Sequence, residues 1–198
     1  MIRKANESDL DRIVKIHMDA FPGYFMTELG KAFMFQYYKT ILLYNYGIVL
    51  VYEDEQGIVG FVTGFYKPNF FYKRLKLRKF IIGVTVLMPL IKNPRLCYRL
   101  LSTYRRTDQN TNRRVEEHLC ELSSIGVMSN LENRGVGQKL VHAFINEAKK
   151  YGPTSVYLYT DVSSNDRVNL FYQKLNFNID RSFESFGNRN MYEYRYNL

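Results

Sequence analysis

The chain has 198 residues, of which 46% are apolar, and its formal net charge is +9. This length can bury a full core as one domain over residues 1–198, and the apolar content excludes an intrinsically disordered protein. The first ten residues, MIRKANESDL, lack the apolar stretch of a secretory signal, and the two cysteines and three histidines form no disulfide or metal pattern. We therefore expect a cytoplasmic protein that holds no metal.

The first third of the chain predicts a strand, two helices and a hairpin. Ser8 and Asp11 have the spacing of a capping box at the start of the first helix. Thr27 is a suitable cap for the second helix. Residues 54–57, Asp-Glu-Gln-Gly, provide the turn of the hairpin. The expected elements are a strand at 2–5, a helix carrying Leu10, Ile13, Val14 and His17 on one face, a helix from 27 to about 46, and strands at 48–53 and 58–66.

The last third returns to a regular alternation of strands and helices. The expected elements are a strand at 117–128, a helix at 136–150, a strand at 155–161, a helix at 166–175, and strands at 177–186 and 190–196. This order is typical of an α/β protein with a mixed sheet.

Residues 67–115 interrupt this order and carry most of the charge. They hold 13 Lys and Arg but one acid, Asp108, so the other 149 residues sum to −3. The apolar run 80–91 is too short to cross a bilayer, which takes about 20 residues. A helix is expected to follow it as far as Arg106, and a polar loop at 107–114.

Three interpretations of this basic insertion stay open. Residues 73–106 could lie on an anionic membrane surface at the inner side of the membrane. The insertion could instead cap a binding site and attract a phosphate-rich substrate. It could also be a helix docked on the core with a solvated basic face. Nucleic acid is not an expected partner, because no binding motif accompanies the basic residues.

Residues 125–140 predict an anion site. An apolar strand ends in a polar loop, the loop turns through Gly135 and Gly137, and an amphipathic helix follows at once. Such a turn directs several backbone N–H groups to one point at the positive end of a helix dipole, where a diphosphate commonly binds. A second segment, 165–177, reads Asn-Asp-Arg-Val-Asn-Leu-Phe-Tyr-Gln-Lys-Leu-Asn-Phe.

Together the two segments resemble the GCN5-related N-acetyltransferases, the GNAT superfamily, which use an acyl-CoA. The family's loop pattern is Gln/Arg-x-x-Gly-x-Gly/Ala after a strand ending Ile-x-Val, and Glu132 departs from its first position. The downstream pattern is met by Asn165, Phe171, Tyr172, Lys174 and Phe177, whereas Val168 and Asn176 replace the usual Ala and Gly. The resemblance covers 117–198 well, 1–66 in outline and the insertion hardly at all. It implies a mixed, centrally splayed sheet flanked by helices, with a basic helical insertion between the third and fourth strands.

The resemblance also implies a set of site residues for acetyl-CoA. The strand backbone at Ile125 and Val127 would bind the pantetheine arm, and the loop N–H groups would bind the pyrophosphate. The N–H of Val127 would stabilise the oxyanion, and Tyr172 would protonate the leaving thiolate. The residues implied for the cofactor are Ile125, Val127, Arg134, Gly135, Val136, Gly137, Gln138, Lys139, Asn165, Tyr172 and Lys174.

Glu121 lies where the histone-acetylating branch of the superfamily has its general base. A carboxylate within an apolar strand is costly to bury, so we expect it to face a cleft, with an exposed strand face as the alternative. Ser123 has the same parity and could line the same cleft. His118 and Glu117 are weaker candidates for the base, and His17 and His142 are expected to be structural.

The acceptor side is expected to involve the loop 21–30. This loop resembles a segment of GNAT members associated with bacterial surface polysaccharides, which implies an amino sugar carried on a nucleotide or lipid as the acceptor. Phe21, Tyr24, Thr27 and Ser123 are the candidate acceptor residues, although the two aromatics could instead be a hydrophobic staple under the loop. The alternatives are a protein amine, a polyamine or an amine-bearing drug as acceptor, or a non-catalytic acyl-CoA-binding scaffold.

Overall fold

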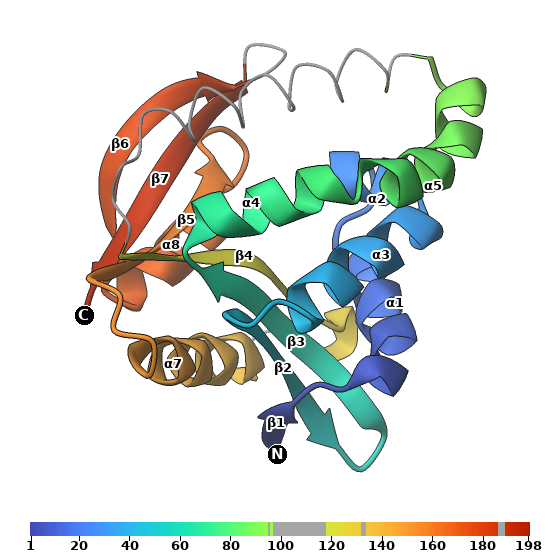
Figure 1. Cartoon of the computed structure of the whole chain (residues 1–198). Helices are drawn as coiled ribbons and strands as arrows, with labels where there is room; N and C mark the ends of the chain where they lie inside the picture. The colour runs from blue at the N-terminus through green and yellow to red at the C-terminus, as the bar shows by residue number, and fades with distance from the viewer. Residues whose placement is uncertain (95, 97–117, 132–133, 186–188) are drawn as a thin grey trace.

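A computed structural model describes residues 1–94, 96, 118–131, 134–185 and 189–198 (Figure 1). These residues form a seven-stranded sheet of order β1-β2-β3-β4-β5-β7-β6. Its strands are β1 (Ile2–Lys4), β2 (Gly47–Asp54), β3 (Gly57–Tyr66), β4 (Leu119–Val127), β5 (Ser155–Asp161), β6 (Asn178–Ser185) and β7 (Arg189–Asn197).

The sheet is mixed, as the sequence predicts. All neighbouring strands pair antiparallel except β4 and β5, which are parallel. The helices are η1 (Glu7–Asp9), α1 (Leu10–Ala20), α2 (Phe25–Glu28), α3 (Lys31–Leu42), α4 (Pro68–Leu77), α5 (Lys79–Lys92), η2 (Ser129–Leu131), α7 (Val136–Lys149) and α8 (Asp166–Lys174).

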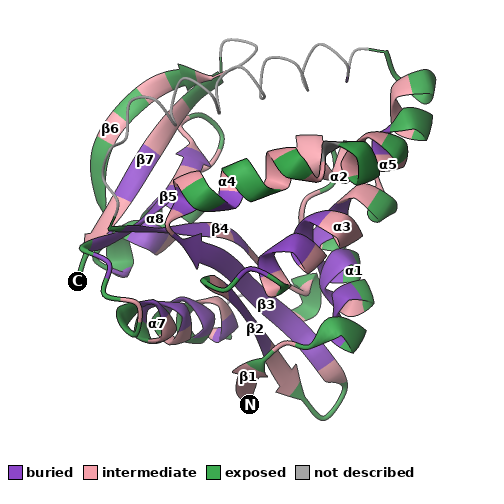
Figure 2. Cartoon of the chain, in the orientation of Figure 1, coloured by how far each residue is buried: buried purple, intermediate pink, exposed green. Residues whose placement is uncertain are grey.

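Two apolar cores lie on opposite faces of the sheet. On one face α7 and α8 contribute Leu140, Phe144 and Tyr172 to a core with strand residues such as Val156 and Tyr194. On the other face α1 and α3 pack on β2 and β3 through a second set of apolar residues, including Leu10, Ile13, Tyr38, Ile41, Phe61 and Phe65. Figure 2 shows β3 and β4 buried between these layers. The sequence of β3 is accordingly apolar on both faces, whereas β4 also buries Glu121 and Ser124.

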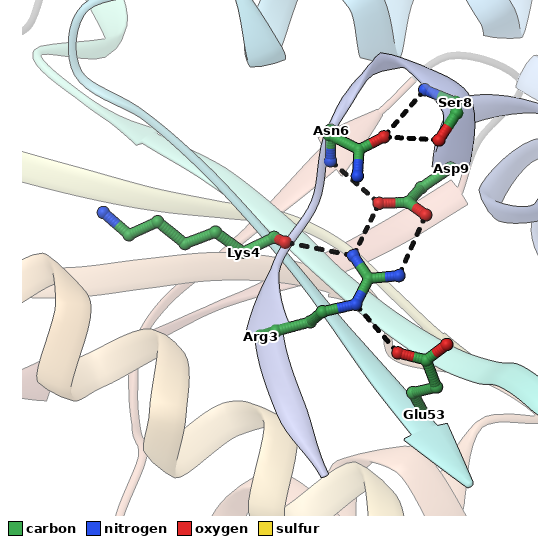
Figure 3. A network of polar contacts seen from close by, with 6 residues as sticks. All are labelled: Arg3, Lys4, Asn6, Ser8, Asp9 and Glu53. Atoms are coloured by element: carbon green, nitrogen blue, oxygen red, sulfur yellow. Dashed lines mark hydrogen bonds and ion pairs between the residues drawn. The ribbon is translucent and has the colours of Figure 1, made fainter. Parts of the chain in front are cut away.

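The capping box predicted at Ser8 and Asp11 is wrong, because the cap lies two residues earlier. The Asn6 side chain accepts from the N–H of Ser8, and the Asp9 carboxylate accepts from the N–H of Asn6 at 2.8 Å. Asp9 is held there by Arg3, whose guanidinium donates to both of its oxygens at 2.7 and 3.0 Å and also to Glu53 at 2.8 Å (Figure 3). This network ties the start of the helical region to β1 and β2.

The cap predicted at Thr27 is also wrong. The region contains two helices, since Gly30 has φ +89°, a left-handed value, between α2 and α3. Thr27 lies inside α2 and its hydroxyl donates to the carbonyl of Phe21 at 2.7 Å. The second helix therefore begins at Lys31 and ends at Leu42, short of the expected Tyr46.

The basic insertion is helical between β3 and β4 in the part that the structure describes, where it forms α4 and α5. The expected helix to Arg106 and the loop 107–114 lie outside the described residues. Within the described ranges, no helix has the length and hydropathy needed to cross a membrane.

Candidate active site

The sheet opens at its centre between β4 and β5. These parallel strands pair only from Leu119–Glu121 to Ser155–Tyr157, although both continue for several residues. Along an antiparallel strand, N–H groups point alternately to either side. The N–H of Met128 donates to Val59 of β3, so those of Val127 and Ile125 point the other way. Backbone donors of β4 therefore face the opening beside β5.

The start of α7 provides the predicted group of backbone donors. Gly135 precedes the helix with φ +75°, a left-handed value that glycine adopts at low cost. The first intrahelical bond is from Lys139 N–H to the Gly135 carbonyl, and no side chain of the described residues caps this end. The N–H groups of Val136, Gly137 and Gln138 are thus those that a helix leaves for an anion. Arg134, Gln138 and Lys139 are exposed, whereas Glu132 lies outside the described residues.

Helix α8 lies beside this turn. A Cβ on Gly137 would lie 3.4 Å from the ring of Phe171, which is an ordinary van der Waals distance, so α7 and α8 are neighbours at this point. Tyr172 is the next residue and is 5% exposed, with ring contacts to Phe171, Phe177 and Tyr194. Burial raises the pKa of its phenol. The structure therefore brings Gly137 and Tyr172 to the same side of the sheet.

The other two α8 residues of the prediction lie at its ends. Asn165 immediately precedes the helix and its amide nitrogen is 3.4 Å from the carbonyl oxygen of Asp161. Lys174 is exposed in the last turn. Asn165 thus has a structural contact that the sequence did not predict.

Glu121 is buried on the opposite face of β4, with 5% exposure. Its two carboxylate oxygens accept hydrogen bonds from the hydroxyls of Tyr72 at 2.7 Å and Tyr157 at 2.6 Å. Burial, followed by the charge of Glu121, raises the pKa of both tyrosines well above 10, so both remain donors at neutral pH. The alternative of an exposed strand face is wrong, because these hydroxyls compensate for burying the carboxylate.

Ser123 lies two residues after Glu121 on the same face, and it is the extra residue of a β-bulge. Thr63 pairs with Ser124 and Gly64 with Leu122, so Ser123 is the extra residue of β4. Its hydroxyl lies 2.7 Å from that of Tyr37, which comes from α3. Burial first, and then the charge of Glu121, raises the pKa of Tyr37. Ser123 and Glu121 thus share a layer of tyrosines from three different elements.

Sequence reasoning missed Tyr37, Tyr72 and Tyr157. Tyr72 lies in the insertion, where its charged neighbours indicate a solvated helix. Tyr157 and Tyr159 lie two residues apart on β5 and therefore share one face of the strand. This spacing was the one indication in the sequence that the face carries hydroxyl groups. No sequence pattern pairs either of them with Glu121, which requires the fold.

The acceptor residues predicted in the first loop lie close together. The Phe21 ring packs on His17 with centroids 4.7 Å apart, and Tyr24 contacts Phe21 edge-on at 5.4 Å. Tyr24 is 44% exposed, while the Thr27 hydroxyl is bonded to Phe21 as described above.

The remaining histidines are placed by the fold at separate points. The exposed His118 has its Nδ1 3.0 Å from the Tyr66 hydroxyl, and His142 is exposed on α7. Glu117 lies outside the described residues. No group of three or more His, Cys, Asp or Glu in the described part of the chain could hold a metal ion.

The site thus combines a mixed sheet splayed between two parallel strands with a glycine turn and a helix beside the opening. The model of the acetyltransferase (GNAT) family matches residues 10–177. The chain therefore belongs to the GNAT family and is an acetyltransferase, and members of this family use acetyl-CoA. None of the curated proteins matches it significantly in sequence.

Solved structures agree on the fold at low sequence identity. An N-acetyltransferase from Staphylococcus aureus superposes with a TM-score of 0.63 at 19% identity, covering 100% of this chain and 97% of that one. A ribosomal-protein-alanine N-acetyltransferase from Brucella melitensis superposes with a TM-score of 0.64 at 18% sequence identity, covering 100% of this chain and 99% of that one. An aminoglycoside 6′-N-acetyltransferase complexed with coenzyme A superposes with a TM-score of 0.63 at 13% sequence identity, covering 100% of this chain and 96% of that one.

Proposed function

We propose that the protein transfers the acetyl group of acetyl-CoA to the primary amine of a small acceptor by direct attack in a ternary complex. The observation that carries this proposal is the opening between β4 and β5. It has the N–H groups of Ile125 and Val127 on one edge and the glycine turn before α7 beside it. A site of this form can hold an extended arm by its backbone and a diphosphate at the helix start.

The cofactor would be held mainly by main-chain groups. The N–H groups of residues 135–138 would bind the pyrophosphate, with the exposed Arg134 and Lys139 adding positive charge. Asn165 and Lys174, at the two ends of α8, would complete the cofactor side.

Two groups would act on the thioester. The N–H of Val127 would donate to the carbonyl oxygen as the amine attacks and the oxyanion develops. The C–N bond forms, the C–S bond breaks, and the thiolate takes a proton from Tyr172. Because burial raises the pKa of Tyr172, its phenol carries that proton at neutral pH.

Glu121 would accept the proton that the attacking amine loses. The donated hydrogen bonds of Tyr72 and Tyr157 favour its ionised form, which a base requires. An ionised carboxylate accepts several hydrogen bonds at once, so the role is compatible with both contacts. Tyr72 and Tyr157 would then be positioning residues, and Ser123 would line the same side.

The acceptor we propose is an amino sugar linked to a nucleotide or lipid. The exposed Tyr24 and the neighbouring Phe21 and Thr27 could bind a sugar ring, and the basic insertion suits a phosphate-rich substrate. The structural neighbours are named for a protein alanine and for an aminoglycoside, so the fold does not select the acceptor. We further propose a cytoplasmic location, which suits the buried free thiol of Cys120.

A substitution of Tyr172 tests the mechanism. Tyr172→Phe should lower kcat at least about 10²-fold, because a positioned general acid contributes that much or more, while CoA binding is unchanged. Thiol release with a panel of amines, including nucleotide-linked amino sugars, measures the rate. Tyr194→Phe is the matched control, since Tyr194 is fully buried in the same core and contacts Tyr172.

Two results would contradict this proposal. An equal decrease of kcat in Tyr172→Phe and Tyr194→Phe would show that the Tyr172 hydroxyl has a structural role and is not the general acid. Binding of CoA without thiol release for any amine would indicate a non-catalytic acyl-CoA-binding scaffold.

A further inference from the structure

Helix α5 has one apolar face that is exposed. Phe80 is 82% exposed, Leu87 is 54% and Ile91 is 71%. At 100° per residue, the exposed apolar side chains of α5 fall within an arc of about 120°. They are Phe80, Ile81, Val84, Leu87, Met88 and Ile91.

The opposite face of α5 is attached to the body of the protein. Val86 is 3% exposed, and Pro89 lies 3.5 Å from where a Cβ on Gly30 would be. Just before α5, the guanidinium of Arg78 donates to the Thr40 hydroxyl of α3 at 2.9 Å. The apolar face is therefore directed outward on a fixed helix, and Figure 2 shows α5 largely exposed at the margin of the molecule.

The segment that carries this face has charges of one sign. Residues 67–94 contain no Asp or Glu, and their basic residues are Lys67, Lys73, Arg74, Lys76, Arg78, Lys79 and Lys92. Lys73 and Arg74 are exposed on α4, and Lys92 is exposed at the end of α5. With 14 residues, α5 is about 21 Å long and can lie along a surface.

We propose that the apolar face of α5 docks on an anionic lipid surface, with the flanking Lys and Arg at the headgroups. Such a surface offers apolar material below a layer of negative charge, and this face of α5 carries apolar side chains beside positive ones. The apolar side chains stand on one convex helix, which a fluid bilayer accommodates without a preformed groove. The docking is separate from the acetyl-transfer chemistry.

The absence of tryptophan from the chain permits a direct test. Phe80→Trp makes the only indole a probe of α5. Its emission should shift to the blue with vesicles of phosphatidylcholine and phosphatidylglycerol, and not with phosphatidylcholine alone. Ile179→Trp is the matched control, because Ile179 is 44% exposed on the edge strand β6, and it should show no shift.

The strength of binding tests both parts of the surface. Leu87→Ser with Ile91→Ser should weaken vesicle sedimentation at least about tenfold, as expected for lost apolar burial. Lys73→Gln should weaken it about fivefold, the typical effect of one basic residue near anionic headgroups. Circular dichroism and melting of each variant confirm folding, which these exposed positions should preserve.

Three outcomes would overturn the proposal. The first is no blue shift of Phe80→Trp with anionic vesicles, and the second is an equal shift with neutral ones. The third is a dimer that Leu87→Ser with Ile91→Ser converts to a monomer, without vesicle binding by either form, which would assign the face to a second copy of the chain. None of these readouts uses an acetyl acceptor, so their failure leaves the proposed function standing.

Discussion

Tyrosine hydroxyls provide much of the buried polar chemistry of this protein. The chain has 17 tyrosines, and those around β4 bond to groups that would otherwise be costly to bury. Tyr37 reaches Ser123, Tyr38 reaches His17, and Tyr72 reaches Glu121. A phenol whose pKa is raised by burial stays a neutral donor over the range in which proteins are stable. It can therefore stabilise a carboxylate or an imidazole without adding charge.

His17 should make the protein sensitive to mild acid. Burial lowers its pKa from 6.5 to about 4, and its Nδ1 is 2.6 Å from the Tyr38 hydroxyl. Between these pH values the unfolded chain binds the proton and the folded chain does not, so lowering the pH favours unfolding. The free energy of unfolding should fall by about 3 kcal/mol from this group as the pH drops from 7 to 4.

Urea unfolding of wild type and His17→Gln over that pH range measures this contribution. The variant should lose about 3 kcal/mol less than wild type. His142→Gln, on the exposed side of α7, should follow wild type. Equal slopes for wild type and His17→Gln would show that this imidazole is not held neutral by burial.

At the scale of elements, two glycines should respond oppositely to alanine. A Cβ on Gly64 of β3 would lie 2.0 Å from the carbonyl oxygen of Glu121 and 2.5 Å from the ring of Phe144. Gly64→Ala should therefore lower the free energy of unfolding by at least about 2 kcal/mol. Gly83 lies within α5 with nothing inside 4 Å of its added Cβ, so Gly83→Ala should raise it by about 0.5–1 kcal/mol.

Urea midpoints of the two variants check this pair. A Gly64→Ala variant as stable as wild type would contradict the close approach of β3, β4 and α7. A loss of stability in Gly83→Ala would show that α5 is not helical at that point.

The strands and long helices were predictable because their apolar periodicity continues over many residues. Helix α7 and strand β5 lie within one residue of the predicted ranges. The ends of the N-terminal helices were not predictable, because they depend on partners that lie outside the helices, although only six residues away. Asp9 turns toward Arg3 of β1, and Thr27 toward the Phe21 carbonyl. Several residues can cap a helix in a given sequence, and contacts with the segment before the helix decide which one does.

At the scale of the whole molecule, CoA binding should stabilise the fold, because the opening and the α7 turn exist only when the sheet is formed. CoA at about 100 times its Kd adds about 2.7 kcal/mol. For a chain of this size that corresponds to a rise in Tm of roughly 5–10 °C, which differential scanning fluorimetry can measure.

Variants at Gly137 test whether the helix N-terminus is responsible. Gly137→Asp places a carboxylate beside the N–H groups and should abolish the rise in Tm with CoA. The asparagine of Gly137→Asn has nearly the same shape as aspartate but no charge, so this variant should keep most of the rise in Tm with CoA. No rise with CoA in folded wild type would contradict the cofactor side of the proposed function.

The candidate site was predictable to different degrees on its two sides. The donor side depends on consecutive backbone groups, which a short motif such as Gly135-Val-Gly137 specifies locally. The acceptor side that we propose combines β4, β5, α3 and α4, whose tyrosines reach Glu121 and Ser123 only through the tertiary fold. Local motifs cannot report contacts between residues 36 to 86 positions apart.

The bulge at Ser123 divides β4 into two segments with opposite phases. Cys120 and Leu122 face the α7 core before it, and Ile125 and Val127 face the same core after it. The bulge absorbs one extra residue, so deletion of Ser123 would leave a strand that alternates regularly. Leu122, Ile125 and Val127 would keep the face of the α7 core, and Glu121 would keep the other face. What the extra residue adds is one more hydroxyl on the Glu121 face, where Ser123 meets Tyr37.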